Sequence, residues 1–318
     1  MKPTLALCIP AYRAEEHLPR LLATAREQDP PFDEIIVCVD ASPDRTAEVA
    51  QQWGASVIVN EQNLGCSGSK NQALARVQSD WVHFHDADDI LLPNFTQEAH
   101  RWMAMEDAPD VVVMGYEWRD FETNELLWTG AFDDEAIGRD PISYAIEHKI
   151  PNFGLYRAQR LKQAGGFLTN PAYLYTEDRA FHIALALQGF RFRSSMAVTS
   201  INWRHGGSMS REHEDRCNLS LIALMKDLSL DPRVPRRARR FVHRWLWRAA
   251  RDLVVHRGPL DVCMSAIATA ENIAPEPSED LSAPFRALAR AVGSQRAFLA
   301  LYHAYPSLKT IQNRLRPA

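Results

Sequence analysis

Apolar runs alternate with amphipathic segments through the first hundred residues of the chain. The apolar runs, which predict buried strands, cover Thr4–Tyr12, Glu34–Asp40, Ser56–Glu61 and Trp81–Asp88. The segments between them have helical spacing of apolar residues and cover Ala14–Gln28, Pro43–Trp53 and Ser67–Gln78. Strands that alternate with helices form βαβ units, and strands covered on both faces read as continuous apolar runs. The pattern predicts an α/β fold with a mainly parallel, Rossmann-like central sheet flanked by helices.

The rhythm changes after Pro109. Two further strands are expected at Val111–Phe121 and Glu125–Phe132, where a polar turn between them is compatible with antiparallel pairing. A helix at Thr176–Gly189 and an extended segment at Phe190–His205 follow, and a helical C-terminal region extends from residue 212. The pattern divides the chain into three sections, 1–110, 111–211 and 212–318.

Composition narrows the class of protein. The 318 residues are 46% hydrophobic and 24% charged, which is typical of a globular protein, and the net charge of −4 argues against a general nucleic-acid binder. No run of about 18 apolar residues is present, so we expect no membrane span, and the N-terminus does not read as a signal peptide. The cysteines are odd in number and form no C-x-x-C pair, which predicts reduced thiols in a cytoplasmic protein.

Polar side chains stand at the ends of the predicted strands. Tyr12, Asp40, Asn63 and Asp86 fall at strand ends or just beyond, and ligands of parallel sheets bind at the carboxyl ends of the strands. The fourth strand ends in three carboxylates within four positions, Asp86, Asp88 and Asp89. Like charges at that spacing repel, so water or a cation must lie among them.

The usual phosphate-binding loops are missing. The first glycine of the chain is Gly54, so neither G-x-G-x-x-G nor a P-loop follows the first strand. If a nucleotide binds, a divalent metal held by carboxylates is the obvious means of neutralising its phosphates.

With these residues assembled, the chain resembles the inverting glycosyltransferases of family 2, which have the GT-A fold. The resemblance is carried by IPAYR (9–13), EIIVCVDASPDRT (34–46), NLGCSGSKNQAL (63–74), WVHFHDADDILLP (81–93), AGGF (164–167), TED (176–178) and WRHGGSMS (203–210). It implies a metal-dependent, hexosyltransferase-type enzyme that moves a sugar from a nucleotide-sugar, expected to be UDP-linked, to a hydroxyl of a glycan or lipid-linked acceptor in cell-envelope polysaccharide biosynthesis. Sections 1–110 and 111–211 would then be the donor-binding and acceptor-binding halves of the GT-A domain.

The resemblance implies a set of donor-binding residues. Asp40 corresponds to the aspartate that accepts a hydrogen bond from the imide N–H of the base, although Val39 stands where the family usually has a second aspartate. Lys70 stands where the family commonly has arginine, so the charge is kept but the bidentate fork is lost. The residues expected to wall the base or to let the backbone approach the nucleotide are Pro10, Ala11, Tyr12, Asn63 and Gly65.

The acidic strand end is the implied metal site. Asp86 and Asp88, with Ala87 between them, match the D-x-D pair, in which the second aspartate coordinates Mn²⁺ or Mg²⁺ and the first contacts the ribose or the metal. His205 is implied as a further metal ligand or diphosphate contact, and Arg204 and Ser208 are candidates for phosphate contacts. The structural alternative is an acidic turn that caps the next helix, and Asp89 is expected to act as such a cap.

The resemblance places the catalytic base at Asp178, with Glu177 orienting the acceptor or supporting the base. An inverting transfer needs one base to take the proton of the attacking hydroxyl, and a carboxylate suffices. The structural alternative is that both acids, with Thr176, only cap a helix.

Other functions stay open at this level. A non-catalytic nucleotide-sugar-binding or scaffold protein on the same fold is the main alternative, while the absent glycine-rich loop argues against a nucleotidyltransferase. The C-terminal segment 233–251 interleaves arginines with aromatic residues, which fits peripheral contact with anionic lipid at the inner membrane face or a helix packed with a basic solvent face. Pairing of two chains through the C-terminal helices is also open.

Overall fold

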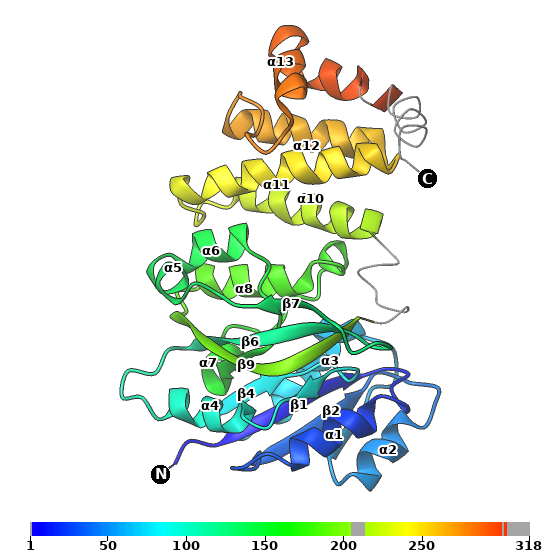
Figure 1. The fold of residues 1–318 in the computed structure, drawn as a ribbon, viewed down its shortest axis with the longest axis vertical. Coiled ribbons are helices and arrows are strands. Elements are labelled where there is room, and N and C mark those ends of the chain that lie inside the picture. The colour runs from blue at the N-terminus through cyan, green and yellow to red at the C-terminus, as the bar shows by residue number, and fades with distance from the viewer. Residues whose placement is uncertain (1, 205–213, 301, 304–318) are drawn as a thin grey trace. The chain divides into compact units, whose positions relative to one another are not determined.

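The computed structural model describes residues 2–204, 214–300 and 302–303. The chain forms two compact units, Met1–Thr169 with Glu177–Ser208, and Asn170–Thr176 with Met209–Ala318. Figure 1 shows a sheet with helices in the first unit and helices in the second. Each unit is described by itself below. The division of the first unit into donor and acceptor halves stays a prediction.

One mixed sheet organises the first unit. Its described strands are β1 (Leu5–Ala11), β2 (Glu34–Val39), β3 (Ser56–Val59), β4 (Trp81–Phe84), β5 (Ile90–Leu91), β6 (Val111–Asp120), β7 (Leu126–Gly130), β8 (Gly154–Arg157) and β9 (Phe192–Arg204). They lie in the order β3-β2-β1-β4-β8-β6-β9-β5, with β7 paired to β6. The four N-terminal strands are parallel to one another. Beyond them, β8 is antiparallel to both β4 and β6, and β7 is antiparallel to β6 as the polar turn indicated.

The helices of the first unit follow the predicted βαβ rhythm. They are α1 (Leu18–Arg26), α2 (Thr46–Gln52), α3 (Gly65–Arg76), α4 (Phe95–Met103), α5 (Asp134–Arg139), α6 (Pro141–Glu147), α7 (Ala158–Gln163) and α8 (Glu177–Leu187). Together with the sheet they confirm the predicted α/β class.

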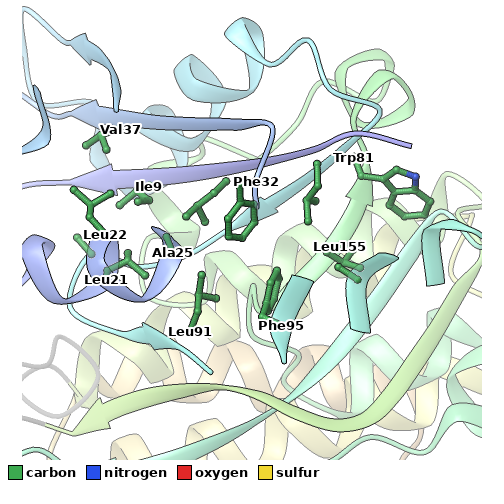
Figure 2. Close-up of a cluster of buried hydrophobic side chains, with 14 of the residues drawn as sticks. Ile9, Leu21, Leu22, Ala25, Phe32, Val37, Trp81, Leu91, Phe95 and Leu155 are labelled. Atoms are coloured by element: carbon green, nitrogen blue, oxygen red, sulfur yellow. The ribbon is translucent and has the colours of Figure 1, made fainter. Parts of the chain in front are cut away.

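A continuous apolar cluster lies between the sheet and helices α1 and α4. Leu5, Leu7 and Ile9 are alternate residues of β1 and therefore share one face of the sheet. Figure 2 shows Leu21 and Leu22 of α1 directed toward this cluster. Burial of such side chains removes about 25 cal/mol of unfavourable hydration per Å² of apolar surface, which is the main force that fixes α1 on the sheet.

The opposite face of the sheet is also covered. Phe84 of β4 contacts Phe167 edge-on at a centroid distance of 4.9 Å, and Phe167 stacks on Phe181 of α8 at 3.8 Å. Burial on both faces explains why the parallel strands read as continuous apolar runs rather than as alternating ones.

The second unit is helical. It contains the short 3-10 turn η1 (Pro171–Tyr173) and the helices α10 (Glu214–Leu230), α11 (Arg236–Val255), α12 (Leu260–Ile273) and α13 (Ala283–Val292). The predicted helical C-terminal region is confirmed for the described residues. None of the described helices has the length and apolar character that crossing a membrane would require.

Helix α11 buries its apolar face within the second unit, where it packs against α10 and α12. Phe241, Leu246 and Trp247 are almost completely buried. Two of its arginines, Arg244 and Arg248, lie within ion-pair distance of Asp280. Phe241 and Trp247 are therefore core residues, whereas Trp245 is only partly buried, so a lipid contact of this helix would rely mainly on its basic side chains.

Candidate active site

Tyr12 and Asp40, two of the predicted polar residues, lie at the carboxyl ends of the parallel strands β1 and β2. Ala11 lies opposite Val39 in the register of β1 and β2, so Tyr12 and Asp40 follow at the same edge. The amide of Asp40 donates to the carbonyl of Ala11 over 2.9 Å, which continues the ladder into the loop. Tyr12 is 47% exposed, so its ring is available to a ligand at this edge.

Asp40 organises the loop that leads into α3. Its carboxylate accepts hydrogen bonds from the Asn60 side chain at 2.9 Å and from the backbone amides of Leu64 at 2.8 Å and Gly65 at 2.9 Å. Gly65 has a φ of +74°, a conformation that residues with a Cβ rarely adopt. Asp40 thus fixes the turn that carries Asn63 and Gly65, and its predicted contact with the base stays a prediction. Asn60 belongs to none of the motifs, so only the fold reveals its contact with Asp40.

Lys70 is a buried cation at the centre of the site. It is 1% exposed, and its Nζ lies 3.3 Å from Oδ1 of Asp86, the first aspartate of the D-x-D pair. Burial alone would lower the pKa of Lys70, but the attraction of Asp86, followed by Asp178 and Glu177, raises it well above its usual value. The ammonium group is therefore charged at neutral pH, pairs with Asp86, and acts through its charge on Asp178 and Glu177 of the second motif.

Both acids of the TED motif lie at the start of α8 and belong to this cluster. Glu177 accepts a hydrogen bond from the hydroxyl of Ser67 on α3 at 3.2 Å. Burial raises the pKa of Glu177 and the pKa of Asp178, and the charge of Lys70 opposes this rise in both cases. The two acids of α8 therefore lie close enough to Lys70 and Asp86 for those charges to act on them, and their catalytic roles stay predictions.

Asp178 is held by two groups that the sequence analysis missed. The side-chain amide of Asn152 donates to Oδ1 of Asp178. The backbone carbonyl of Asp178 accepts from Nδ1 of His182 at 2.7 Å, and Nε2 of His182 lies 2.9 Å from the hydroxyl of Tyr156. Burial lowers the pKa of His182 to about 4, so this histidine is neutral and Tyr156 donates to it. Neither Asn152 nor Tyr156 belongs to a recognisable motif, so only the fold could reveal them.

Asn71 fixes the loop after α7 that precedes the TED motif. Its side chain donates to the carbonyl of Phe167 at 2.9 Å and accepts from the amide of Phe167 at 2.8 Å. A Cβ at Gly166, which has a φ of +70°, would lie 2.3 Å from Oδ1 of Asn71. The glycine of the AGGF motif therefore allows this loop to approach α3.

The prediction that Asp89 caps the following helix is wrong. Asp89 is 1% exposed, and its carboxylate accepts hydrogen bonds from the Asn202 side chain at 2.6 Å and from the amide of Trp203 at 2.9 Å. Helix α4 begins only at Phe95, too far along the chain for a cap. Burial raises the pKa of Asp89 well above its usual value. Asp89 instead ties the acidic loop to the end of β9.

The sequence profile of glycosyl transferase family 2 matches residues 6–166, which is about half of the 318 residues. The chain belongs to glycosyl transferase family 2. The resemblance to this family is thus confirmed. EpsH of Bacillus subtilis (strain 168), which carries the name of a glycosyltransferase, is 24% identical over 214 residues, or 63% of this chain. The chain spans 58% of the length of EpsH.

Solved structures confirm the GT-A type of fold for this family 2 chain. Staphylococcus aureus TarS 1-349 in complex with UDP-GlcNAc superposes with a TM-score of 0.68 and 17% sequence identity, over 96% of this chain and 92% of that chain. A mannosyltransferase from Pyrobaculum calidifontis, solved with GDP-Man and Mn²⁺, gives a TM-score of 0.58 and 20% identity, over 98% of this chain and 85% of that chain.

The residues present fit a hard divalent cation of the kind that the family resemblance implies. Asp86 and Asp88 offer carboxylate oxygens, which Mn²⁺ and Mg²⁺ prefer. Within the described residues, no three side chains of ligand type converge, so the metal would need further oxygens from the donor or from water. His205 and Ser208 lie outside the described residues. Arg204 is paired with Asp120 at 3.2 Å, and its phosphate contact stays a prediction.

Proposed function

We propose that this family 2 protein is a metal-dependent, inverting glycosyltransferase that moves a sugar from a UDP-linked donor to a hydroxyl of a glycan or lipid-linked acceptor. The observation that carries the proposal is the buried Lys70, which pairs with Asp86 of the acidic loop and whose charge also acts on Glu177 and Asp178 of α8. A donor-binding carboxylate and a general base must lie close together in such an enzyme, because the attacked anomeric carbon lies next to the diphosphate. TarS with UDP-GlcNAc supports the UDP-linked donor.

The donor would bind at the carboxyl edge of the parallel strands. Tyr12 would face the base together with Pro10 and Ala11. Oδ2 of Asp40 accepts from the amide of Gly65, and its second lone pair would accept from the base. Asn63, Gly65 and Ala87 would line the path of the ribose and diphosphate. Asp88, assisted by Asp86 and by His205, would hold Mn²⁺ or Mg²⁺. When bound, the metal offsets the charge of the diphosphate leaving group.

The chemical step uses the acids of α8. Asp178 would take the proton of the acceptor hydroxyl as that oxygen attacks the anomeric carbon, and the nucleoside diphosphate leaves from the opposite face, which inverts the configuration. Its pKa is raised by burial, which makes it a stronger base than a solvated aspartate while Lys70 keeps it ionised. Glu177, bonded to Ser67, would orient the acceptor or support Asp178.

Substitution of Asp88 by alanine is expected to abolish metal-dependent donor binding. Thermal unfolding is measured with a panel of UDP, GDP, CDP and dTDP sugars, each with and without Mn²⁺. A nucleotide sugar at about 100 times its dissociation constant stabilises a protein by roughly 2.7 kcal/mol, and the wild type should show such a shift only with metal. Asp107→Ala, which removes a surface carboxylate paired with Arg191, is the control and should keep the shift.

Two results would contradict this assignment. An Asp88→Ala protein whose Mn²⁺-stimulated UDP affinity equals that of the wild type would remove Asp88 as a ligand. A wild type that binds a nucleotide sugar but never releases nucleoside diphosphate with any acceptor preparation would favour the alternative, a non-catalytic nucleotide-sugar-binding scaffold.

We further propose a cytoplasmic location with peripheral contact at the inner membrane face through the basic side chains of α11. Because most apolar side chains of that helix are buried, the attraction would be mainly electrostatic and should weaken with salt. The measurement is co-sedimentation with anionic vesicles at low and high ionic strength. The absence of pelleting at low salt, or pelleting that salt does not reduce, would count against this contact.

A further inference from the structure

We propose that Asn152 is a positioning residue for the general base, whose side-chain amide holds one oxygen of Asp178 so that the other oxygen is left to take the acceptor proton. The inference rests on the proposed glycosyltransferase function and adds a residue to its machinery. Asn152 lies in the turn between α6 and β8, outside every motif that carried the family resemblance.

The contact is direct and shielded from water. Asn152 is 5% exposed, and its Nδ2 donates to Oδ1 of Asp178. Among the described residues, Oδ2 of Asp178 has no hydrogen-bond donor. A hydrogen bond to a carboxylate is charge-assisted and directional, so it selects one rotamer of the acid and one orientation of its two oxygens.

The turn that carries Asn152 is itself fixed on two sides. The ring of Phe153 lies 5.0 Å from that of Tyr116 on β6 and 5.5 Å from that of His85 after β4. The carbonyl of Gly154 lies 2.8 Å from Nδ1 of His83. Asn152 is therefore held against the sheet that also carries the acidic loop, and it transmits that fixed position to Asp178 on α8.

The side-chain oxygen of Asn152 indicates that this residue does not serve packing alone. Its Oδ1 is buried without a hydrogen-bond partner in the described part of the chain. A buried unpaired carbonyl oxygen costs stability, and an apolar residue of similar size would avoid that cost. Proteins leave buried polar atoms without a hydrogen bond mainly at functional sites. Here the amide is explained by its N–H group, which donates to the base.

The electrostatic surroundings of Asp178 come from several elements. The charged and titratable groups that face it are Lys70 of α3, Lys149 before β8, Asp86 after β4, Tyr116 of β6, Tyr156 of β8 and Glu177 and His182 of α8. Asn152 is the neutral donor among these groups. It favours the ionised form of Asp178 without adding a charge that would compete with Lys70 for the other carboxylates.

Three substitutions separate a donor role from a packing role. Asn152→Asp keeps the shape but loses the donor, Asn152→Ala loses both, and Asn152→Ser keeps a shorter donor. The rate of UDP release from UDP-N-acetylglucosamine with Mn²⁺ and water as acceptor is measured for each. We expect kcat to fall by about 10- to 100-fold in the alanine and aspartate variants, with the aspartate variant no better than alanine, partial recovery in the serine variant and an unchanged KM.

If Asn152 only fills space, the aspartate variant, which keeps its shape, should be more active than the alanine and serine variants. If Asn152→Asp retains the wild-type kcat, or if the losses lie in KM alone, the inference is overturned. Asn94→Ala, which removes an amide that donates to the carbonyl of Val198 at 3.1 Å on the surface, is the matched control and should retain the wild-type kcat. Thermal unfolding of every variant checks that the fold is retained.

A measurement without substrate separates this inference from the proposed function. In protein labelled with ¹³C at aspartate Cγ, the Asp178 signal is the one that disappears in Asp178→Asn, and its titration is followed by NMR. Loss of the amide donor should raise the pKa of Asp178 in Asn152→Ala, whereas Asn94→Ala should leave it unchanged. An unchanged titration in Asn152→Ala overturns the inference. A raised pKa in a protein that hydrolyses no UDP sugar supports the contact and counts against the proposed function alone.

Discussion

Replacement of Asp178 by asparagine is expected to lower turnover by about 10²- to 10⁴-fold, the range that general base catalysis contributes in other enzymes. Asparagine has the same shape but cannot take a proton. Donor binding should be nearly unchanged, because the donor-binding carboxylates and Lys70 remain in place. The measurements are the rate of UDP release and the metal-dependent thermal shift with the same nucleotide sugar. A variant that retains most of its turnover would exclude Asp178 as the base.

Glu177→Gln is the matched control for this prediction. Its side chain lies in the same group of carboxylates but accepts a hydrogen bond from Ser67. We therefore expect a smaller loss of turnover than in Asp178→Asn. The pH profile gives an independent check. The base must be deprotonated to act, so kcat/KM should rise with pH through the pKa of Asp178, and burial places that limb above the usual aspartate range.

Substitution of Lys70 by methionine is expected to lower the free energy of unfolding by about 3–5 kcal/mol at neutral pH, because it leaves buried carboxylates without their cation. The loss should depend on pH. Without Lys70, the pKa values of Glu177 and Asp178 in the folded protein rise further above their unfolded values. Groups with raised folded pKa values contribute stability only at low pH and lose it as pH rises. The difference between wild type and variant should therefore grow as pH rises above the pKa values that the two acids have in the unfolded chain, about 4.

Denaturant unfolding across that pH range measures the effect. Lys162→Met removes a lysine that donates to the carbonyl of Val77 at 2.6 Å rather than to a carboxylate. It should cost only about 1 kcal/mol, with little dependence on pH. If Lys70→Met is equally mild, or if its cost falls as pH rises, Lys70 is not the cation that holds the cluster together.

The lysine at position 70 has one interpretation from the sequence and another from the structure. In the sequence, lysine in place of the family's usual arginine keeps the positive charge but loses the bidentate fork. In the structure the ammonium group is buried against Asp86, where a compact point charge serves several carboxylates at once. A planar guanidinium would favour one bidentate partner instead. The role that the geometry gives Lys70 is therefore to hold the acids of two motifs together.

The sequence by itself determined the parallel half of the fold and the edge where the site lies. Burial on both faces requires uninterrupted apolar strands, and the connecting helices require their own period, so both appear as local patterns. Polar residues such as Tyr12, Asp40 and Asp86 stand where these apolar runs end, so their position at the strand ends can also be seen in the sequence. The acidic pair of α8 could also be recognised, because its motif is local. Information that is confined to neighbouring residues survives in the one-dimensional pattern.

Only the tertiary structure decided the partners of these residues. Asp89 accepts a hydrogen bond from Trp203, and Asp178 accepts one from Asn152. These partners lie far apart in the sequence, so no local pattern of residues predicts them. The insertion of β8 between β4 and β6 likewise depends on pairing between distant segments. The aromatic residues of α11 fit either a lipid surface or a protein core from their pattern alone, because both environments remove apolar surface from water. Which of the two is present depends on whether neighbouring helices cover that face. In this fold α11 packs against α10 and α12, and Phe241 and Trp247 are buried, while Trp245 stays partly exposed.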